Sequence, residues 1–581
     1  MKKFIHIVSN HLLMAKYFFK FAPAYFLLHF LFCIYVSFVD MLAGTYSVQY
    51  IFNGLSDGKG FREIFIFLVF VSLAMLVRHI FGAVTAEYLS AMASAKVTAG
   101  LNKVIFEKAR KMDLVYYETP KFYTDFVWAA SQAEGKLGEM YGSWCVFVAR
   151  LSDIIFFGGF MVATDGTLMI FAVVLLVIRL VISGLRIKKR YSMNVEIKPH
   201  ERRRDYMTRV FYLADYAKEI RLSDIHKTLF ERLKKTMAKI RDINDKGGKK
   251  LMVYSLIQNM STEAVLDFFM YLYLCVKTII TKTLKFGDLA SLTNAVWNFT
   301  GSANEFIRVL SELGEQSLYV DHFRNFMAYE PEIERQPGVE APKEPSVISL
   351  KNVCFKYEGA ENYSLKNINL EIKPYEKIAV VGYNGAGKST LVKLIMRLYD
   401  VTAGEILLNG TNIKEYETES YRKTFGSVFQ DYKVFAGTVA ENVEMDFVKE
   451  ERRNIIEESL RKSGFSEKLS ALKKGIDTPL TREFSDEGVN LSGGEEQKIA
   501  ISRIFAKNCS YVILDEPSSA LDPISEYKLN ETMMTLSEKK TVIFISHRLS
   551  TTCMADRIIM LENGEIIEEG SHDSLMSING K

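Results

Sequence analysis

Apolar residues are concentrated in the first half of the chain, in stretches long enough to cross a lipid bilayer. A membrane-spanning helix needs about 20 apolar residues, and six stretches of about that length precede residue 314. They cover about residues 21–52, 64–84, 141–163, 168–185, 256–281 and 287–313. The sixth is the least apolar, because asparagine and charged residues interrupt it. The pattern predicts an α-helical polytopic membrane domain over residues 1–330, with six transmembrane helices.

The charges between these stretches indicate how the helices are oriented. Lysine and arginine are frequent before the first stretch, between the second and third, and after the fourth, and the other connections are poorer in them. Because such residues are enriched on the cytosolic side, both termini are expected in the cytosol. The first stretch is too long for the apolar core of a cleaved signal peptide, so we expect it to persist. Thr164–Asp165–Gly166 separates the third stretch from the fourth.

The two long cytosolic connections are helix-like rather than loop-like. Residues 91–112 and 204–222 carry amphipathic patterns without clusters of glycine or proline, which favours membrane helices that continue far into the cytosol. Each connection contains an aromatic-rich break, at residues 112–120 in the first and at 206–216 in the second. Such extensions are expected to contact another part of the protein.

The character of the chain changes after residue 330. Residues 331–346 form a polar linker with Pro337, Pro342 and Pro345. Residues 347–357 then alternate like a β-strand, and residues 377–381 form a compact β-branched run. We therefore expect a second, soluble domain over residues 347–581.

A phosphate-binding motif follows that run directly. Gly382–Ser389 reads Gly-Tyr-Asn-Gly-Ala-Gly-Lys-Ser, which matches G-x-x-x-x-G-K-[ST] between a strand and a helix. The glycines let backbone N–H groups approach phosphate oxygens, and the helix N-terminus favours the same charge. Lys388 is expected at the β- and γ-phosphates and Ser389 at Mg²⁺. The alternative is a glycine-rich turn that fits by chance, which the flanking strand and helix disfavour.

A second strand, residues 511–514, ends in Asp515 and Glu516. An apolar run that closes on two carboxylates puts both at the carboxyl edge of the sheet, where α/β folds bind ligands. One carboxylate can hold Mg²⁺ through water while the other polarises the attacking water. Strand ends of this kind are common by themselves. They are much better evidence of a nucleotide site when a phosphate loop precedes them in the chain. The second domain is therefore expected to be an α/β P-loop NTPase cassette.

The composition agrees with two unlike halves. The 581 residues are 49% hydrophobic yet 24% charged, which is a mean over an apolar region and a charged one. With 73 basic and 69 acidic residues, the charge is too balanced for a protein that binds nucleic acid by whole-chain electrostatics. The six cysteines fall singly, without a CxxC pair. Their spacing argues against a zinc site or a disulfide scaffold and predicts reduced, mostly buried thiols.

Between the two nucleotide motifs lies Leu491–Glu495, which reads Leu-Ser-Gly-Gly-Glu. With this pentapeptide the chain resembles exporter half-transporters of the ATP-binding cassette (ABC) family, which fuse six membrane helices to one cassette. The resemblance covers nearly the whole chain, and its cassette part is highly specific. It implies ATP and Mg²⁺ as cofactors and ATP hydrolysis coupled to transport. It also implies a second half-transporter as partner, in the plasma (inner) membrane of a bacterium with the cassette in the cytosol.

The resemblance implies a role for each residue at the nucleotide. Tyr357 resembles the aromatic residue that stacks on adenine, and Asp522 lies in the loop that couples the two ATP sites. Ser492 and Gly494 match the signature loop that closes over ATP held by the opposite cassette. The expected ATP-binding residues are Tyr357, Gly382, Asn384, Gly385, Gly387, Lys388, Ser389, Thr390, Ser492, Gly493, Gly494 and Asp522.

Catalytic and metal-binding roles follow from the same resemblance. Glu516 is expected to be the general base, and His547 resembles the histidine that contacts the γ-phosphate. Gln430 resembles the glutamine that touches Mg²⁺ and senses the membrane domain. The expected Mg²⁺ ligands are Ser389, Gln430 and Asp515.

Three further features bear on how such a transporter would work. The breaks near residues 113–123 and 204–214 resemble coupling helices, which seat on the cassettes. The signature carries Glu495 where the family usually has glutamine, so this charge either points away and is tolerated or weakens the signature. A heterodimer with a degenerate partner and a homodimer both stay open. No peptidase domain fits before the first stretch, so leader removal would need another protein.

We infer the chemistry of the cargo from ionisable residues inside the membrane stretches, because such residues are energetically costly in a bilayer and often functional. The candidates are Asp40, Asp153, Glu263 and Asp267. Their acidity suits a cationic peptide or an amphiphilic or hydrophobic compound, and the alternative is ion pairing between helices, for example with Arg78, Arg150 or Lys277. A lipid flippase shares the architecture, and an ATP-gated channel or regulator is a less favoured reading.

Overall fold

The fold is given by a computed structural model, which describes residues 2–131, 133–260, 267–333, 338–516, 527, 531, 539–546 and 552–577. The chain divides into two compact units. The first combines Met1–Lys108 with Thr124–Ala328, and the second combines Ala109–Tyr123 with Tyr329–Lys581. The second unit therefore includes a short segment that lies far from the cassette in the sequence.

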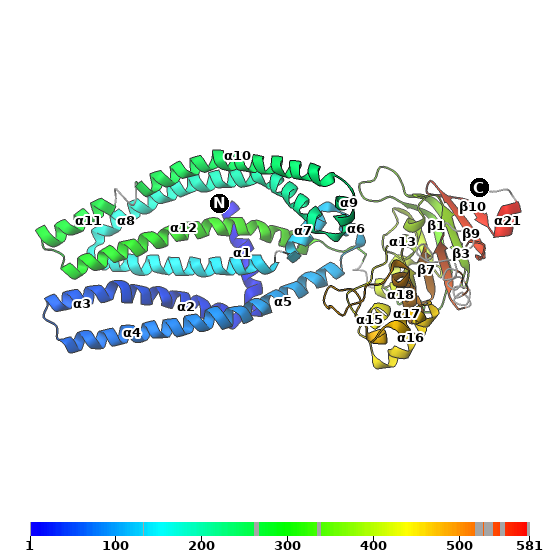
Figure 1. The fold of residues 1–581 in the computed structure, drawn as a ribbon, viewed down its shortest axis with the longest axis horizontal. Helices are drawn as coiled ribbons and strands as arrows, with labels where there is room; N and C mark the ends of the chain where they lie inside the picture. Colours follow the sequence, from blue (N-terminus) through cyan, green and yellow to red (C-terminus); the bar gives the residue numbers. More distant parts are fainter. Residues whose placement is uncertain are drawn as a thin grey trace. The chain divides into compact units, whose positions relative to one another are not determined.

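The first unit is made of long helices (Figure 1). The helices up to residue 328 are α1 (Lys2–Phe21), α2 (Pro23–Met41), η1 (Leu42–Tyr46), α3 (Ser47–Ser56), α4 (Phe61–Ala83), η2 (Val84–Leu89), α5 (Ser90–Arg110), α6 (Leu114–Tyr117), α7 (Pro120–Ser131), α8 (Ala133–Tyr212), η3 (Ala214–Tyr216), α9 (Ala217–Leu222), α10 (Ile225–Asn259), α11 (Asp267–Cys275), η5 (Val276–Ile280) and α12 (Phe286–Ala328). Pro23 stands at the start of α2, where a missing N–H is tolerated because no helical partner exists there.

Three helices of the described residues are long and apolar enough to cross a membrane, namely Pro23–Ser56, Phe61–Arg110 and Gly135–Tyr212. The third includes Asp165, whose backbone leaves the helical region (φ −151°, ψ 98°), and the ribbon reverses direction along α8 (Figure 1). The Asp165 side chain accepts a 3.1 Å hydrogen bond from the Thr167 N–H and forms a 3.0 Å ion pair with Lys277. The count of six transmembrane helices stays a prediction.

The helices of the first unit share an apolar core. Phe157 and Met161 of α8 pack with Leu274 of α11 and with Leu292 and Phe299 of α12, and all five are almost fully buried. The predicted cytosolic extensions are helical as well, since α5 reaches Arg110 and α8 reaches Tyr212. The break expected at residues 206–216 begins only after Tyr212, because residues 206–212 continue α8.

The cassette contains two β-sheets. In the first, β1 (Ile348–Phe355) lies between β2 (Leu365–Ile372) and β4 (Ala403–Leu408), and β5 (Thr411–Asn412) pairs with β4, all antiparallel. The second has the order β10-β9-β3-β8-β7-β6. Its strands are β3 (Lys377–Gly382), β6 (Phe425–Val428), β7 (Tyr511–Asp515), β8 (Thr541–Ile545), β9 (Arg557–Glu562) and β10 (Glu565–Gly570). They pair in parallel except β10, so the carboxyl ends of β3, β8 and β7 meet at one edge.

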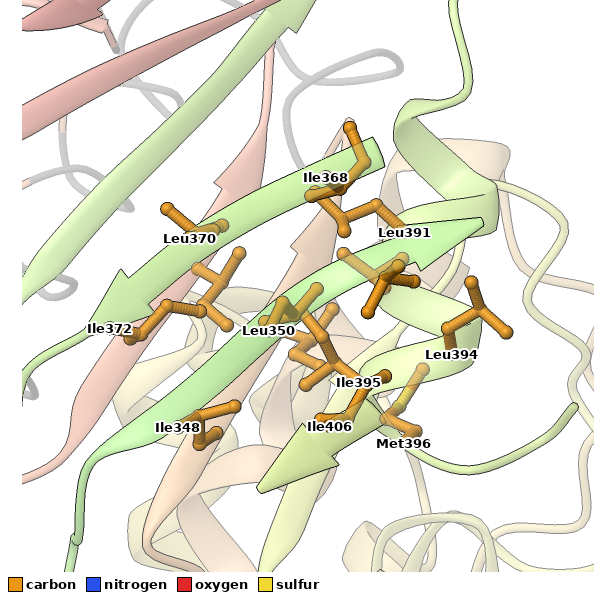
Figure 2. Packing of buried hydrophobic residues seen from close by; sticks show 14 of the residues in the cluster. Ile348, Leu350, Ile368, Leu370, Ile372, Leu391, Leu394, Ile395, Met396 and Ile406 are labelled. Atoms are coloured by element: carbon orange, nitrogen blue, oxygen red, sulfur yellow. The ribbon is translucent and has the colours of Figure 1, made fainter. Parts of the chain in front are cut away.

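Helix α13 (Lys388–Ile395) is held by the core of the cassette. Its Leu391, Leu394 and Ile395 pack with residues such as Leu350 and Ile368 of the antiparallel sheet (Figure 2). Each of these side chains is at most 2% exposed. Burying one such side chain contributes roughly 1.5–3 kcal/mol, so the helix that follows the phosphate motif is rigidly anchored.

The remaining cassette helices are α14 (Thr418–Lys423), η6 (Ile413–Glu415), α15 (Val439–Glu444), η7 (Glu450–Arg452), α16 (Arg453–Lys462), α17 (Ser466–Ala471), η8 (Gly475–Asp477), α18 (Gly493–Ala506) and α21 (His572–Ser577). They include η6 and α14, which pack against the core around the antiparallel sheet, and a small helical layer around α15, α16 and α18. Val439, Ile456 and Ile499 are fully buried in the core that α15, α16 and α18 share. This core fixes the start of α18, where the signature residues lie.

Candidate functional site

The loop between β3 and α13 has the backbone of a phosphate cradle. Gly382, Gly385 and Gly387 have φ values of 144°, 83° and 104°, which side chains rarely adopt. A Cβ added at Gly387 would also lie 2.7 Å from the carbonyl oxygen of Ser364. Conformation therefore favours glycine at all three positions, and lack of space excludes a side chain at Gly387 as well.

Lys388 is the first residue of α13 and is buried. Its Nζ donates hydrogen bonds to the carbonyl oxygens of Gly382 (2.8 Å) and Tyr383 (3.0 Å), so the ammonium lies along the loop. Burial lowers the pKa of Lys388, although the nearby carboxylates of Glu516 and Asp515 act in the opposite direction. A negatively charged phosphate in the loop would raise the pKa of Lys388 again, because a nearby opposite charge favours the protonated form.

Two carboxylates face this loop from the end of β7. Asp515 is buried, and its Oδ2 accepts a 3.0 Å hydrogen bond from Ser389 Oγ. Burial raises the pKa of Asp515, and the Ser389 hydrogen bond opposes the shift in part. Glu516 has a positive φ of 50°, and its side chain accepts a 3.1 Å hydrogen bond from Gln430 Nε2. Positive φ outside glycine is uncommon and is often found at functional sites.

These groups line one cavity of about 330 Å³. Its lining residues are Ser364, Asn384, Gly385, Gly387, Lys388, Ser389, Thr390, Gln430, Asp515, Glu516 and Ile545. Sequence reasoning missed Ser364 and Ile545. Ser364 precedes β2 and has no motif of its own, whereas Ile545 ends the strand that leads to His547 and could have been inferred from that position.

The donor set fits Mg²⁺. Ser389 and Asp515 are already within hydrogen-bond distance of each other, and hydroxyl and carboxylate oxygens are what Mg²⁺ prefers. Gln430 donates through its nitrogen to Glu516, so its amide oxygen is the atom that can face a metal. The three expected ligands thus come from α13, β7 and the segment after β6.

Other expected site residues lie apart from this cavity or outside the described residues. Tyr357 does not line it; its hydroxyl lies 3.2 Å from Thr390 Oγ1, and its ring packs edge-on against Phe355 and Tyr399. Its stacking on adenine stays a prediction. Asp522 and His547 lie outside the described residues.

The signature residues lie at the start of α18 and do not line the cavity either. Ser492 is the N-cap of α18, and its hydroxyl accepts the N–H of Glu495 while Glu495 accepts the N–H of Ser492 at 2.8 Å. Glu495 also forms a 3.0 Å ion pair with Lys468. Burial raises the pKa of Glu495, but these hydrogen bonds and Lys468 outweigh it and leave the pKa lowered. The unusual glutamate is thus part of a capping box.

Two of the acidic cargo candidates have partners within the chain. Asp40 forms an ion pair with Arg78. Asp153 is paired with Arg150 at 2.7 Å and accepts a 2.8 Å hydrogen bond from Ser302. The Asp40 contact joins α2 and α4 and agrees with pairing between helices, whereas Arg150 and Asp153 lie three residues apart on α8, so their ion pair is within one helix. Glu263 lies outside the described residues, and Asp267 begins α11.

A polar cavity of about 450 Å³ lies among α8, α10 and α12. It is lined by Ser183, Arg186, Arg190, Asn194, Gln258, Asn304, Glu305, Ile307, Arg308, Ser311, Glu312 and Glu315. Arg186 donates a 2.9 Å hydrogen bond to Gln258, and Arg308 pairs with Glu305 and Glu312. Sequence reasoning missed this cavity because these residues come from three distant helices.

The segment 109–123 belongs to the cassette unit. Val115 packs against the cassette core, and Tyr399 donates a 2.5 Å hydrogen bond to the Glu118 carboxylate. Asp113 accepts the backbone N–H of Glu332 at 2.7 Å. A short helix from the first half of the chain is therefore built into the cassette, at the position of the first expected coupling helix.

The fold and the cavity define a P-loop ATPase cassette joined to a helical, membrane-type region. Residues 365–519 match the family described as ABC transporter. The multidrug export ATP-binding/permease protein YgaD of Bacillus subtilis (strain 168), so named, is 41% identical over 229 residues, which are 39% of this chain and 39% of that protein. A protein of the same description from Staphylococcus aureus (strain N315) is 41% identical over 233 residues, 40% of this chain and 39% of that protein.

The alignments with these relatives thus span 39% of their length. A solved structure of a bacterial Atm1-family ABC exporter with ATP bound is similar over 96% of both chains, with a TM-score of 0.73 and 21% identity. The cassette, over residues 365–519, is thus similar to the ABC transporter family. As a whole the chain has the fold of that bacterial exporter chain.

Proposed function

We propose that this chain is one half of an ATP-driven exporter that moves an amphiphilic or peptide-like compound out of a bacterial cell. The observation that carries the proposal is the convergence of Lys388, Ser389, Gln430, Asp515 and Glu516 on one cavity. Multidrug export in the names of the relatives and the exporter fold support it. In this proposal the cassette lies in the cytosol and the helices cross the plasma membrane.

The residues of the cavity suit phosphoryl transfer to water. The glycine loop and Lys388 would hold the β- and γ-phosphates, and the fixed ammonium would stabilise charge that develops on the transferred group. Glu516 would accept a hydrogen bond from the attacking water and orient it for in-line attack. Gln430 holds the Glu516 carboxylate through its 3.1 Å hydrogen bond, so it would position the base.

Mg²⁺ would be held by Ser389, Asp515 and Gln430 and would supply neutralising charge at the phosphate oxygens. His547 and Asp522 keep the roles that the family resemblance implies, at the γ-phosphate and at the junction of the two ATP sites. Tyr357 keeps its expected place beside adenine.

A second half is part of the proposal. Ser492 caps α18, Gly493 and Gly494 begin it, and none of the three lines the cavity of their own cassette. This supports a head-to-tail dimer in which they close over ATP of the partner. Both a homodimer and a heterodimer accommodate this. The segment around Glu118 and Tyr399 would carry cassette closure to the membrane helices, as would the end of α8 near residues 204–214.

The polar cavity among α8, α10 and α12 suggests the chemistry of the cargo. It presents arginines and glutamates together, partly paired with each other. Such a lining favours a cargo with charged groups, because exchange of ion-pair partners offsets the desolvation of each charge. Asp40 and Asp153 stay weaker candidates since each has a partner.

The experiment is ATP-dependent uptake into inside-out membrane vesicles, with zwitterionic peptides, cationic dyes and labelled lipids compared. We expect uptake of charged amphiphiles that needs ATP and is lost in Lys388→Ala. Uptake of labelled lipid alone would favour a flippase, and ion currents without cargo-stimulated ATP hydrolysis would favour a channel. Either result would overturn the proposed export of amphiphiles.

A further inference from the structure

Three metal-binding side chains gather between α2 and α8, remote in sequence from the cassette. His29 and Cys33 lie four residues apart on α2, so they face the same side of the helix. Cys145 lies on α8, which packs along α2. The ligand atoms of the three residues all lie within 4.8 Å of one another. Among the residues that the structure describes, this is the one group of three such ligands.

The distances suit a bound metal ion without rearrangement of the helices. His29 Nδ1 and Cys145 Sγ are 3.6 Å apart. Two ligands of a tetrahedral zinc ion, with bonds of about 2.3 Å to sulfur and about 2.0 Å to nitrogen, lie about 3.6 Å apart. Small side-chain rotations would therefore be enough to close the site.

The surroundings select the kind of ion. Cys33 and Cys145 are 9% and 8% exposed, and the ring of Tyr25 lies 5.3 Å from that of His29. Hard cations such as Mg²⁺ keep water and need oxygen ligands, whereas two thiolates and an imidazole favour thiophilic d¹⁰ ions.

Tyr141 holds the imidazole through a 2.9 Å hydrogen bond between its hydroxyl and His29 Nδ1. In the metal-bound form this hydroxyl supplies either a fourth ligand or a second-sphere hydrogen bond.

The ordinary alternative is a core histidine next to two buried thiols. A Cys–His pair elsewhere shows what chance packing gives: Cys553 and His572 also approach to 3.6 Å, but the thiol is exposed and no third ligand joins them in the described part of the cassette. Three convergent ligands from two helices, enclosed by aromatic rings, are harder to explain by chance packing than such a pair. The spacing of cysteines along the sequence could not reveal this, because the site is assembled across helices.

We propose that His29, Cys33 and Cys145 form a binding site for a thiophilic d¹⁰ metal ion, with Zn²⁺ as the physiological candidate, which ties α2 to α8. Binding releases the thiol protons, since the thiolates are the ligands. The bound ion stabilises the packing of the two helices because the unfolded chain has no preformed site. The site is resident in the protein and separate from the polar cavity proposed for the cargo.

The test uses the full chain in lipid nanodiscs, without a polyhistidine tag, reduced and stripped of metal by a chelator that is then removed. Cd²⁺ serves as the probe, because thiolate binding gives an ultraviolet charge-transfer band. We expect one tightly bound Cd²⁺ per chain with this band. We expect both to be lost in Cys33→Ser and in Cys145→Ser, and kept in the matched control Cys553→Ser.

His29→Cys and His29→Phe separate ligation from packing. His29→Cys replaces one soft ligand by another and is expected to keep the ion, whereas His29→Phe is expected to lose it. Zn²⁺ should raise the thermal midpoint of the wild type and of Cys553→Ser but not of Cys33→Ser, while basal ATP hydrolysis verifies that each variant is folded. Absence of a charge-transfer band in the wild type, or one equally strong in Cys33→Ser, would overturn the proposal.

Discussion

The side-chain amide of Gln430 donates a 3.1 Å hydrogen bond to Oε2 of Glu516. The two residues follow β6 and β7, which are neighbours in the parallel sheet. The hydrogen bond fixes a carboxylate that stands on a backbone with φ of 50°. A conformation of this kind costs about 1–3 kcal/mol, and it aims Glu516 into the cavity that holds Lys388.

Glu516→Gln tests the role of this carboxylate. The amide keeps the size of the side chain but cannot act as a base, so we expect ATP hydrolysis to fall at least about 100-fold. The affinity for ATP should change only a few-fold, because the phosphate loop is intact. Phosphate release and binding of a fluorescent ATP analogue measure the two quantities. Glu565→Gln, at the exposed start of β10, is the control and should change neither; turnover close to normal in Glu516→Gln would refute the assignment.

Asp515→Asn separates a stability effect from a metal effect. Burial raises the pKa of Asp515, so the folded state binds more protons than the unfolded state between about pH 3.9 and the raised pKa. Stability therefore falls as pH rises through this window, and the penalty persists at neutral pH. Without nucleotide, Asp515→Asn should melt higher than the wild type at pH 7, and the difference should shrink as pH approaches 4.

The same variant should respond differently to Mg²⁺ and ATP. Asparagine cannot neutralise the metal, so the increase in thermal midpoint that Mg-ATP gives to the wild type should be largely lost. Melting curves at pH 4 to 8, with and without Mg-ATP, measure both effects. A variant that melts lower than the wild type without nucleotide, yet gains fully from Mg-ATP, would contradict the roles of burial and of metal binding together.

Tyr399→Phe tests the contact between the cassette and the segment around Glu118. Burial, and secondarily Glu118, raises the pKa of Tyr399, so the hydroxyl stays a donor at any usual pH. Loss of this hydrogen bond to a carboxylate should cost about 1.5–3 kcal/mol and loosen the segment. We expect transport per ATP hydrolysed to fall, with ATP affinity unchanged. Tyr363→Phe, on an exposed side chain, is the control; equal transport per ATP in Tyr399→Phe and wild type would exclude a coupling role.

Glu495→Gln restores the usual residue of the signature. Glutamine can keep the capping box, and only the partly exposed ion pair with Lys468 is lost. We expect stability to change by less than about 1 kcal/mol and ATP hydrolysis by less than about twofold. Steady-state hydrolysis of the purified dimer measures this, with Glu496→Gln as the neighbouring control. A several-fold rise in hydrolysis would show instead that the native charge weakens the signature.

The sequence could predict the nucleotide cavity because its residues stand at strand ends. Lys388, Asp515 and Glu516 follow parallel strands, and the carboxyl ends of such strands meet at one edge. Local sequence motifs were therefore sufficient to predict that these three residues lie close together. The same reasoning missed Ser364, whose place depends on how the antiparallel sheet packs beside the loop.

Contacts within the helical unit could not be read in this way. Asp40 and Asp153 are equally costly in a membrane whether they bind cargo or have partners within the chain. The packing of α2 on α4 brings Arg78 to Asp40, and the packing of α8 on α12 brings Ser302 to Asp153. The contact of Glu118 with Tyr399 joins residues far apart in the sequence. The late end of α8 reflects a helix that continues through an aromatic-rich stretch, because aromatic residues disfavour helices only weakly.

Coupled measurement of ATP hydrolysis and cargo uptake in the same inside-out vesicles tests the central claim most directly. We expect a charged amphiphile to accumulate in wild-type vesicles and to stimulate phosphate release. In Glu516→Gln both rates should fall together while ATP binding persists. Uptake that continues in Glu516→Gln, or hydrolysis in the wild type that no cargo stimulates and that moves none, would contradict export driven by this cassette.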